Sequence, residues 1–165
     1  MTFSIHQASA PVFTRALTNL SAMIDKALAA GVAEATLLEA RLAPDMHPFP
    51  RQIQMASDSA KGAIARLAGV EPPSMPDTET TIAELKARIA ATIAYVNSVD
   101  PAAFDGAEDR EVVLKFPQGE MTFTGCDYLT GFALPNFFFH ITIAYALMRA
   151  GGAPIGKMDF LAGAR

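Results

Sequence analysis

The apolar residues at the start of the chain recur every three or four positions, a spacing that places them on one face of a helix. They are Phe13, Leu17, Leu20, Ile24 and Leu28. The pattern predicts a helix from about Phe3 to Ala30 that ends at Gly31. Pro11 is expected to end a leading turn, kink this helix or lie in its first turn. A short helix should follow, stopping ahead of Pro44.

Two later segments have the same periodicity. One predicts a helix from about Pro50 to Leu67, in which Gly62 and several alanines permit close approach of a neighbouring helix. The other predicts a helix that begins near Thr81, because Glu84 three residues later completes a capping box. The segment between them, 69–80, is rich in proline and predicts a long linker.

The pattern changes after residue 110. Two β-prone runs, Val112 to Phe116 and Met121 to Thr124, flank a Pro-Gln-Gly turn and predict a small hairpin. A last helix is expected from about Pro135 to Ala150, with Gly131 and Pro135 marking a break before it. Four main helices, a long middle connection and this hairpin predict a mainly all-α four-helix bundle. The 165 residues are expected to form one domain, 1–165.

The charge and cysteine content narrow the classes of function. The net charge is −4 and no run of Lys or Arg occurs, which argues against nucleic acid as a partner. Cys126 is the only cysteine, so neither a disulfide framework nor a thiolate metal cluster is available within the chain. This favours a cytoplasmic location, as does the lack of a signal-peptide pattern at the start.

The span from Tyr128 to Met148 carries no formal charge and is long enough to cross a bilayer. Pro135, Asn136 and His140 interrupt it, so we interpret it as a buried bundle helix and expect no membrane partner.

Three stretches and the spacing of the helices resemble a known family. The stretches are LAPDMHPFPRQIQMASDSAKGAIARLAG, AEDREV and DYLTGFALPNFFFHITIAYALMRAGGAPIGKMDFL. Together with the order of the helices they resemble the DinB-like, YfiT-like superfamily of bacterial four-helix-bundle proteins over almost the whole chain. Within it, the chain looks closest to a branch known only as a domain of unknown function. The resemblance implies a DinB-like bundle with a long middle crossover, and a homodimer.

The resemblance also implies a metal site, from which this sequence departs. Metal-binding members carry one His on the second long helix and a His-x-x-x-His pair on the last, a spacing that places two imidazoles on one helical face. His140 corresponds to the second His of that pair, and Asn136 stands in place of the first. The matching part of the second helix offers Gln52, Gln54 and Asp58 but no His. The usual three-His site is therefore degenerate.

Asn136 and His140 are interpreted either as hydrogen-bonded core residues, as an altered ligand pair, or as part of a metal-free pocket. Asp58 either forms a surface pair with Lys61 or faces His140 and raises the pKa of its ring. The candidate pocket residues are Asn136, His140, Asp58, Gln54 and Tyr128. Gln52 and Gln54 are not expected to point inward together. No cofactor is expected beyond a weakly bound divalent metal ion, whose ligands would be His140, Asn136 and Asp58.

The aromatic run Phe137 to Phe139 points in most directions around its helix, so the hairpin or a second subunit is expected to cover the outer face. Three functions remain open. The first is a homodimeric bundle that binds a small ligand near His140. The second is a metal-dependent transferase or hydrolase, similar to thiol S-transferases, with a reduced ligand set. The third is a structural or interaction protein that acts through its dimer surface.

Overall fold

The first helix begins at a capping box. The structure is a computed structural model that describes residues 4–162. Ser4 precedes α1 (Ile5–Ala29), and its hydroxyl accepts a hydrogen bond from the Gln7 N–H while the Gln7 side chain accepts one from the Ser4 N–H. Pro11 lies inside α1 and is exposed, so it neither ends a leading turn nor falls in the first turn.

The remaining elements follow the predicted order. Within residues 4–162 they are α2 (Glu34–Glu39), α3 (Phe49–Ala68), α4 (Ile82–Ser98), the 3₁₀-helix η1 (Pro101–Phe104), β1 (Glu111–Phe116), β2 (Gly119–Thr124), α5 (Gly125–Tyr128), the π-helical turn η2 (Leu129–Ala133), α6 (Leu134–Ala150) and α7 (Lys157–Ala162). Pro50 stands in the first turn of α3, and Gly69 ends that helix in the left-handed conformation, with φ of 69°. The capping box of Thr81 and Glu84 at the start of α4 is confirmed.

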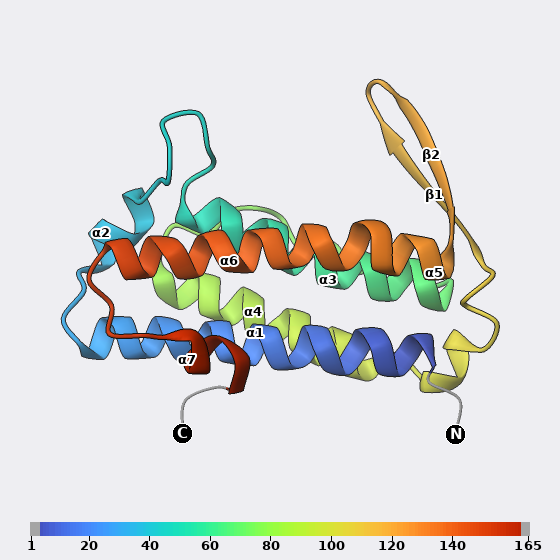
Figure 1. Ribbon diagram of the computed structural model, residues 1–165, viewed down its shortest axis with the longest axis horizontal. Coiled ribbons are helices and arrows are strands. Elements are labelled where there is room, and N and C mark those ends of the chain that lie inside the picture. The colour runs from blue at the N-terminus through green and yellow to red at the C-terminus, as the bar shows by residue number, and fades with distance from the viewer. Residues whose placement is uncertain (1–3, 163–165) are drawn as a thin grey trace.

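The four long helices form a bundle in which α3 and α4 run in the same direction (Figure 1). The linker between them, residues 69–81, therefore returns along the length of the bundle, as the predicted long crossover requires. Helix α3 packs against both α6 and α4, and α1 packs against α4. The core between them is built from apolar side chains that include Phe13, Leu17, Leu20, Ile53, Ile64, Ile89, Phe137 and Ile141.

The break expected at Gly131 and Pro135 is wrong. The chain is helical without interruption from Gly125 to Ala150, passing from α5 through η2 into α6. Pro135 has no N–H to donate, and in an α-helix its ring would clash with the Gly131 carbonyl. The wider π turn, in which the Leu134 N–H donates to the Leu129 carbonyl, accommodates the proline in place of a break.

The same continuous helix, Gly125–Ala150, is long and apolar enough to cross a membrane by length and composition alone. Core helices of bundles pass this test too, and this one packs along α3 and α1. Among its aromatic run, Phe137 is fully buried and Phe138 lies against Phe160 of α7, with ring centroids 6.5 Å apart. Phe139 remains 51% exposed, so neither the hairpin nor the C-terminal segment covers that part of the helix.

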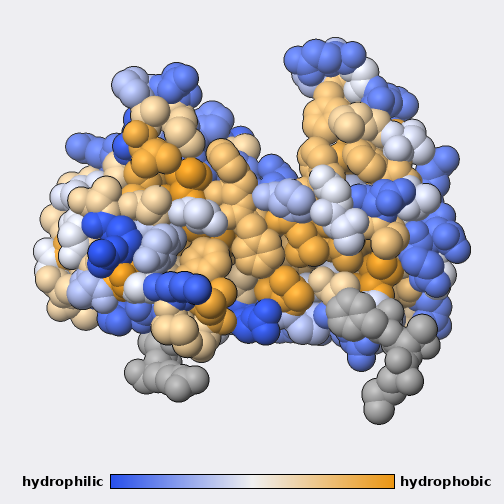
Figure 2. All heavy atoms as spheres, viewed as in Figure 1, coloured by the Kyte–Doolittle hydropathy of each residue, from blue (hydrophilic) through white to orange (hydrophobic). Residues whose placement is uncertain are grey.

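The hairpin of β1 and β2 projects from one end of the bundle (Figure 1). The strands pair in antiparallel register, with Leu114 opposite Met121. Leu114 and Val112 alternate into the core, whereas Met121 is 48% exposed. Figure 2 shows that apolar side chains gather along the visible face of the helices and on the inner side of this projection, above a hollow.

Candidate functional site

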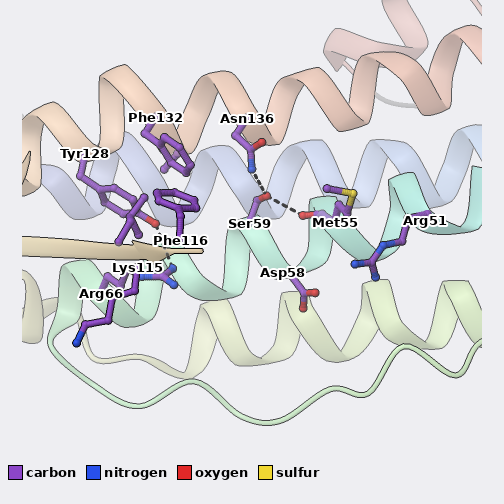
Figure 3. A pocket seen from close by; sticks show the side chains of 12 residues that line it. Arg51, Met55, Asp58, Ser59, Arg66, Lys115, Phe116, Tyr128, Phe132 and Asn136 are labelled. Atoms are coloured by element: carbon purple, nitrogen blue, oxygen red, sulfur yellow. Dashed lines mark hydrogen bonds between the residues drawn. The ribbon is translucent and has the colours of Figure 1, made fainter. Parts of the chain in front are cut away.

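A pocket of about 310 Å³ lies against strand β1 of the hairpin. It lies between α3, β1 and the helix formed by α5, η2 and α6 (Figure 3). Its lining residues are Arg51, Met55, Asp58, Ser59 and Arg66 from α3, Leu114, Lys115 and Phe116 from β1, and Tyr128, Phe132, Ala133 and Asn136 from the last helix. Three of the predicted pocket residues, Tyr128, Asn136 and Asp58, therefore lie around one cavity.

One wall of the pocket is aromatic. The rings of Tyr128 and Phe132 stack with centroids 6.1 Å apart and planes inclined by 18°. Phe116 closes this wall from the hairpin, with its ring centroid 6.2 Å from that of Phe132 and 41% of its surface exposed. Such a wall offers a flat apolar surface to a ligand while water still reaches its outer edge.

Asn136 lies on the helix side of the pocket and is tied to α3 (Figure 3). Its amide Nδ2 donates to Ser59 Oγ at 2.7 Å, and the Ser59 hydroxyl donates to the Met55 carbonyl at 2.7 Å. These two hydrogen bonds orient the Asn136 amide and hold α6 against α3. Asn136 is therefore a hydrogen-bonded residue on the pocket surface.

Arg66 and Tyr128 form the polar corner of the pocket. Arg66 Nη1 donates to the Tyr128 hydroxyl at 3.3 Å, and the guanidinium carbon lies 6.0 Å from the centre of the Tyr128 ring. Burial raises the pKa of the Tyr128 hydroxyl, and the charge and hydrogen bond of Arg66 offset part of that rise. The phenol therefore stays protonated and can donate as well as accept.

Asp58 does not face His140. Its carboxylate pairs with Lys61 Nζ at 3.0 Å and with Arg88 Nη2 of α4 at 2.9 Å. The pairing with Lys61 agrees with the surface-pair interpretation, but Lys61 itself is largely buried and Arg88 extends the pair into a larger cluster. Asp58 therefore borders the pocket with its charge already balanced by two cations.

His140 lies in the core and does not line this pocket. Its Nδ1 is 2.8 Å from Gln52 Oε1, and Gln52 Nε2 donates to the His47 carbonyl at 3.0 Å. Because Gln52 uses its oxygen as the acceptor, Nδ1 of the neutral His140 ring carries the proton. Burial lowers the pKa of His140, and the charges of His47 and Arg51 lower it further.

Gln54 also lies outside the pocket, although it is buried. Its Nε2 donates to Glu79 of the linker at 2.9 Å, and its oxygen accepts from Arg51. Only Gln52 is directed at His140 in the core, as the expected difference in faces requires, but both residues are buried, with exposed fractions of 2% and 6%. They do point to different faces of α3, but the linker covers the second face and buries it as well.

The three residues named as the ligands of a metal have separate partners. His140 bonds to Gln52, Asn136 donates to Ser59, and Asp58 pairs with Lys61 and Arg88. Within residues 4–162, no group of three or more His, Cys, Asp or Glu side chains could hold a metal ion. A borderline metal such as zinc favours imidazole and thiolate ligands, and the donor set observed here does not fit it.

Arg66, Phe116 and Phe132 line the pocket but were not singled out from the sequence. Arg66 has one sequence signal that could have revealed it: Gly62 stands four residues earlier, on the same helical face. We expected Gly62 to admit a neighbouring helix. Instead, a Cβ built at Gly62 would lie 2.4 Å from Arg66 Nη1, so the space is filled by a side chain of the same helix.

Comparison with known proteins gives the family. The sequence matches, over residues 5–161, a family described as a domain of unknown function, DUF1993. The protein belongs to the DUF1993 family. The DUF1993 chain is also similar to the crystal structure of a DinB family member protein from Shewanella denitrificans, with a TM-score of 0.87 and 37% sequence identity. The match covers 98% of this chain and 93% of the other. No curated protein matches the chain.

These findings confirm the resemblance to the DinB-like superfamily and to a branch of unknown function. They also confirm the fold class, a mainly helical bundle with a hairpin before the last helix. The π turn η2 of this DUF1993 chain places Phe132 in the pocket wall. Such turns are rare and occur frequently at functional sites.

Proposed function

We propose that this DUF1993 protein binds a small organic ligand in the pocket between α3, the hairpin and the last helix. The observation that carries the proposal is the pocket itself, a cavity of about 310 Å³ with an aromatic wall and a few convergent polar groups. Small-molecule sites have this composition and a volume of about 300–1,000 Å³. From the sequence we expected the ligand to lie near His140. The site proposed here is instead the neighbouring cavity, which is lined by Tyr128 and Asn136.

The proposal is tested by thermal unfolding of the protein with a panel of small metabolites. A ligand that binds only the folded state raises the midpoint of unfolding, by an amount that grows with the logarithm of its concentration above the Kd. We expect at least one compound to stabilise the wild type, and the shift to disappear in Phe116→Ala. Phe116 is 41% exposed, so its removal does not open the core.

The matched control is Met121→Ala. Met121 is an exposed apolar residue on the same hairpin, 48% accessible, but it does not line this pocket. The stabilisation by ligand should survive in this variant. A panel without any stabilising compound, or a shift that persists unchanged in Phe116→Ala, would contradict the proposal.

A metal-dependent transferase or hydrolase is the second function predicted from the resemblance, and the contacts of its three named ligands do not support it. Elemental analysis of protein purified without added metal separates the two. Stoichiometric zinc or nickel that is lost in His140→Ala would favour the metal enzyme over the metal-free pocket. The third function, an interaction protein, is favoured if neither metal nor small ligand changes the unfolding midpoint.

A further inference from the structure

Gly62 lies in the interior of α3, where no turn or cap calls for a glycine. An interior glycine weakens a helix relative to alanine, and its backbone here has no left-handed φ that would favour it. Its missing side chain instead leaves room for the guanidinium of Arg66, one turn later: a Cβ at position 62 would meet Arg66 Nη1 at 2.4 Å. The glycine thus allows Arg66 to fold back along its own helix.

This folded-back conformation places Arg66 against the pocket wall. Its Nη1 reaches the hydroxyl of Tyr128, a residue only 2% exposed. A guanidinium has five N–H donors, of which this contact uses one. Within residues 4–162, Arg66 has no carboxylate within salt-bridge distance. The Tyr128 hydroxyl accepts from Arg66 and keeps its own proton available for donation.

The other charges around the pocket already have partners. Arg51 pairs with Asp77, and Lys115 Nζ lies 3.4 Å from Glu120 Oε1. The one carboxylate in the lining, Asp58, is neutralised by Lys61 and Arg88. Since Arg51, Lys115 and Asp58 are balanced by these partners, Arg66 is the one charge of the lining without an ion-pair partner within residues 4–162, and it makes the lining positive. A ligand of negative charge complements this lining.

We propose that Arg66 and Tyr128, with Gly62 as the positioning residue, form the anion-recognition position of the pocket. The ligand class is a small organic anion whose apolar body lies on Phe116 and Phe132. This inference rests on the proposed ligand-binding function and specifies its chemistry. A carboxylate or a phosphate monoester meets the same requirement, because the planar guanidinium donates to two oxygens of either group.

The test is an NMR titration of the full chain with three probes that share one aromatic body: phenylacetate, phenyl phosphate and neutral phenylacetamide. We expect one of the two anions to bind about tenfold tighter than the amide, or more, with shift changes at Arg66 and Tyr128. The ratio between phenylacetate and phenyl phosphate identifies the anionic group that the site prefers.

Two variants assign the selectivity to the proposed residues. In Gly62→Ala the new Cβ displaces the Arg66 head, and only the far end of a flexible side chain has to move, so the fold is kept. We expect the affinity for the anion to fall about tenfold, the affinity for the amide to stay constant, and the unfolding midpoint to stay level or rise. Arg66→Gln should reproduce the loss of selectivity.

Gly131→Ala is the matched control, because a Cβ at Gly131 meets nothing within 4 Å. It should bind all three probes as the wild type does. Equal affinity of the wild type for anion and amide, or unchanged anion affinity in both Gly62→Ala and Arg66→Gln, overturns the inference. If the probes fail at millimolar concentration while neutral compounds of the metabolite panel stabilise the protein, the anion assignment fails and the proposed function stands. If both sets fail, both proposals fall.

Discussion

The guanidinium of Arg88 holds the long linker against the bundle. Its side chain is 2% exposed and lies 2.9 Å from oxygens of Asp58, Asp77 and Glu79. It also donates to the Pro76 carbonyl at 3.1 Å. Burial would raise the pKa of Glu79, but the hydrogen bonds from Arg88 and Gln54 outweigh it and lower the pKa. Two of these carboxylates and the carbonyl belong to the linker, which Arg88 therefore anchors.

Arg88→Ala should lower the free energy of unfolding by about 3 kcal/mol, because it leaves three carboxylates together without their shared cation. Urea denaturation measures this change. The control is Lys86→Ala, because Lys86 lies on α4, as Arg88 does, and forms a surface pair with Asp25 of α1. That variant should lose less than about 1 kcal/mol. Equal losses in both variants would contradict the role given to Arg88.

His140 makes stability depend on pH. Its pKa in the folded protein is lower than the ordinary value of 6.5, first because of burial and then because of the charges of His47 and Arg51. Below that ordinary value the unfolded chain binds more protons than the folded one. The neutral buried ring therefore makes its full contribution to the free energy of unfolding above a pH of about 6.5. This contribution is lost as the pH falls through the pKa of the folded state.

We expect His140→Gln to reduce the loss of stability between about pH 7 and pH 5, by at most about 1.4 kcal/mol per pH unit. The measurement is the free energy of unfolding in urea across this range. His47→Gln removes an exposed imidazole whose charge is the smaller cause of the lowered pKa of His140, so it should change the slope by less than His140→Gln does. An unchanged pH slope in His140→Gln would show that other groups cause the dependence.

Tyr128, Asn136 and Asp58 could be named from the sequence because each is a polar residue near an apolar helical face. Gln54 lies outside this pocket and Arg66 lines it, and neither placement could be predicted, for the same physical reason. The surroundings of a side chain on α3 depend on what packs over each face, and the linker and hairpin are distant in sequence. Periodicity assigns faces of a helix but does not say which element covers them.

At the scale of elements, Gly125 lies at the junction where the chain passes from the hairpin back into the helical bundle. Gly125 begins α5 directly after β2, and a Cβ there would lie 1.8 Å from the Ala107 carbonyl oxygen. The next residue, Cys126, donates its backbone N–H to the Glu108 carbonyl at 2.9 Å. The two backbone segments are thus in direct contact where the hairpin leaves and rejoins the helices.

Gly125→Ala should therefore lower the free energy of unfolding by about 2 kcal/mol, because backbone must move to admit the methyl group. Gly131→Ala, whose Cβ meets nothing within 4 Å, should be neutral within about 1 kcal/mol. Thermal and urea unfolding of the two variants provide the comparison. A neutral Gly125→Ala would mean that the junction yields easily.

The elements that follow local rules were predicted closely. Helix α4 and its capping box depend on neighbouring residues, as does the stop of α3 at Gly69. The last helix was predicted too short because Gly131 and Pro135 normally end a helix. Packing of Phe132 and Ala133 in the bundle favours continuation through a π turn, and such tertiary stabilisation has no local sequence pattern.

At the scale of the whole molecule, the expected homodimer stays a prediction. Exposed apolar residues give it two locations, Phe139 on α6 and the hairpin residues Val113 and Met121. Light scattering after size exclusion should give twice the chain mass of 17.5 kDa. Phe139→Asp should shift the protein toward the single-chain mass, whereas Val70→Asp, at the start of the linker, should not. A single-chain mass for the wild type at every concentration would exclude the dimer.

The π turn sets the rotational phase of the last helix. Two turns of an α-helix take about seven residues, so residues spaced by one more than this are rotated by about 80° from each other. Tyr128 and Asn136 have that longer spacing, yet both line the same pocket. The π turn between them absorbs the additional residue and brings the two side chains back into phase. By the same arithmetic, deleting one residue of this turn would leave a spacing of seven in a regular helix, and Tyr128 and Asn136 would still face one side. The pocket therefore tolerates the additional residue only because the turn that contains it is wide.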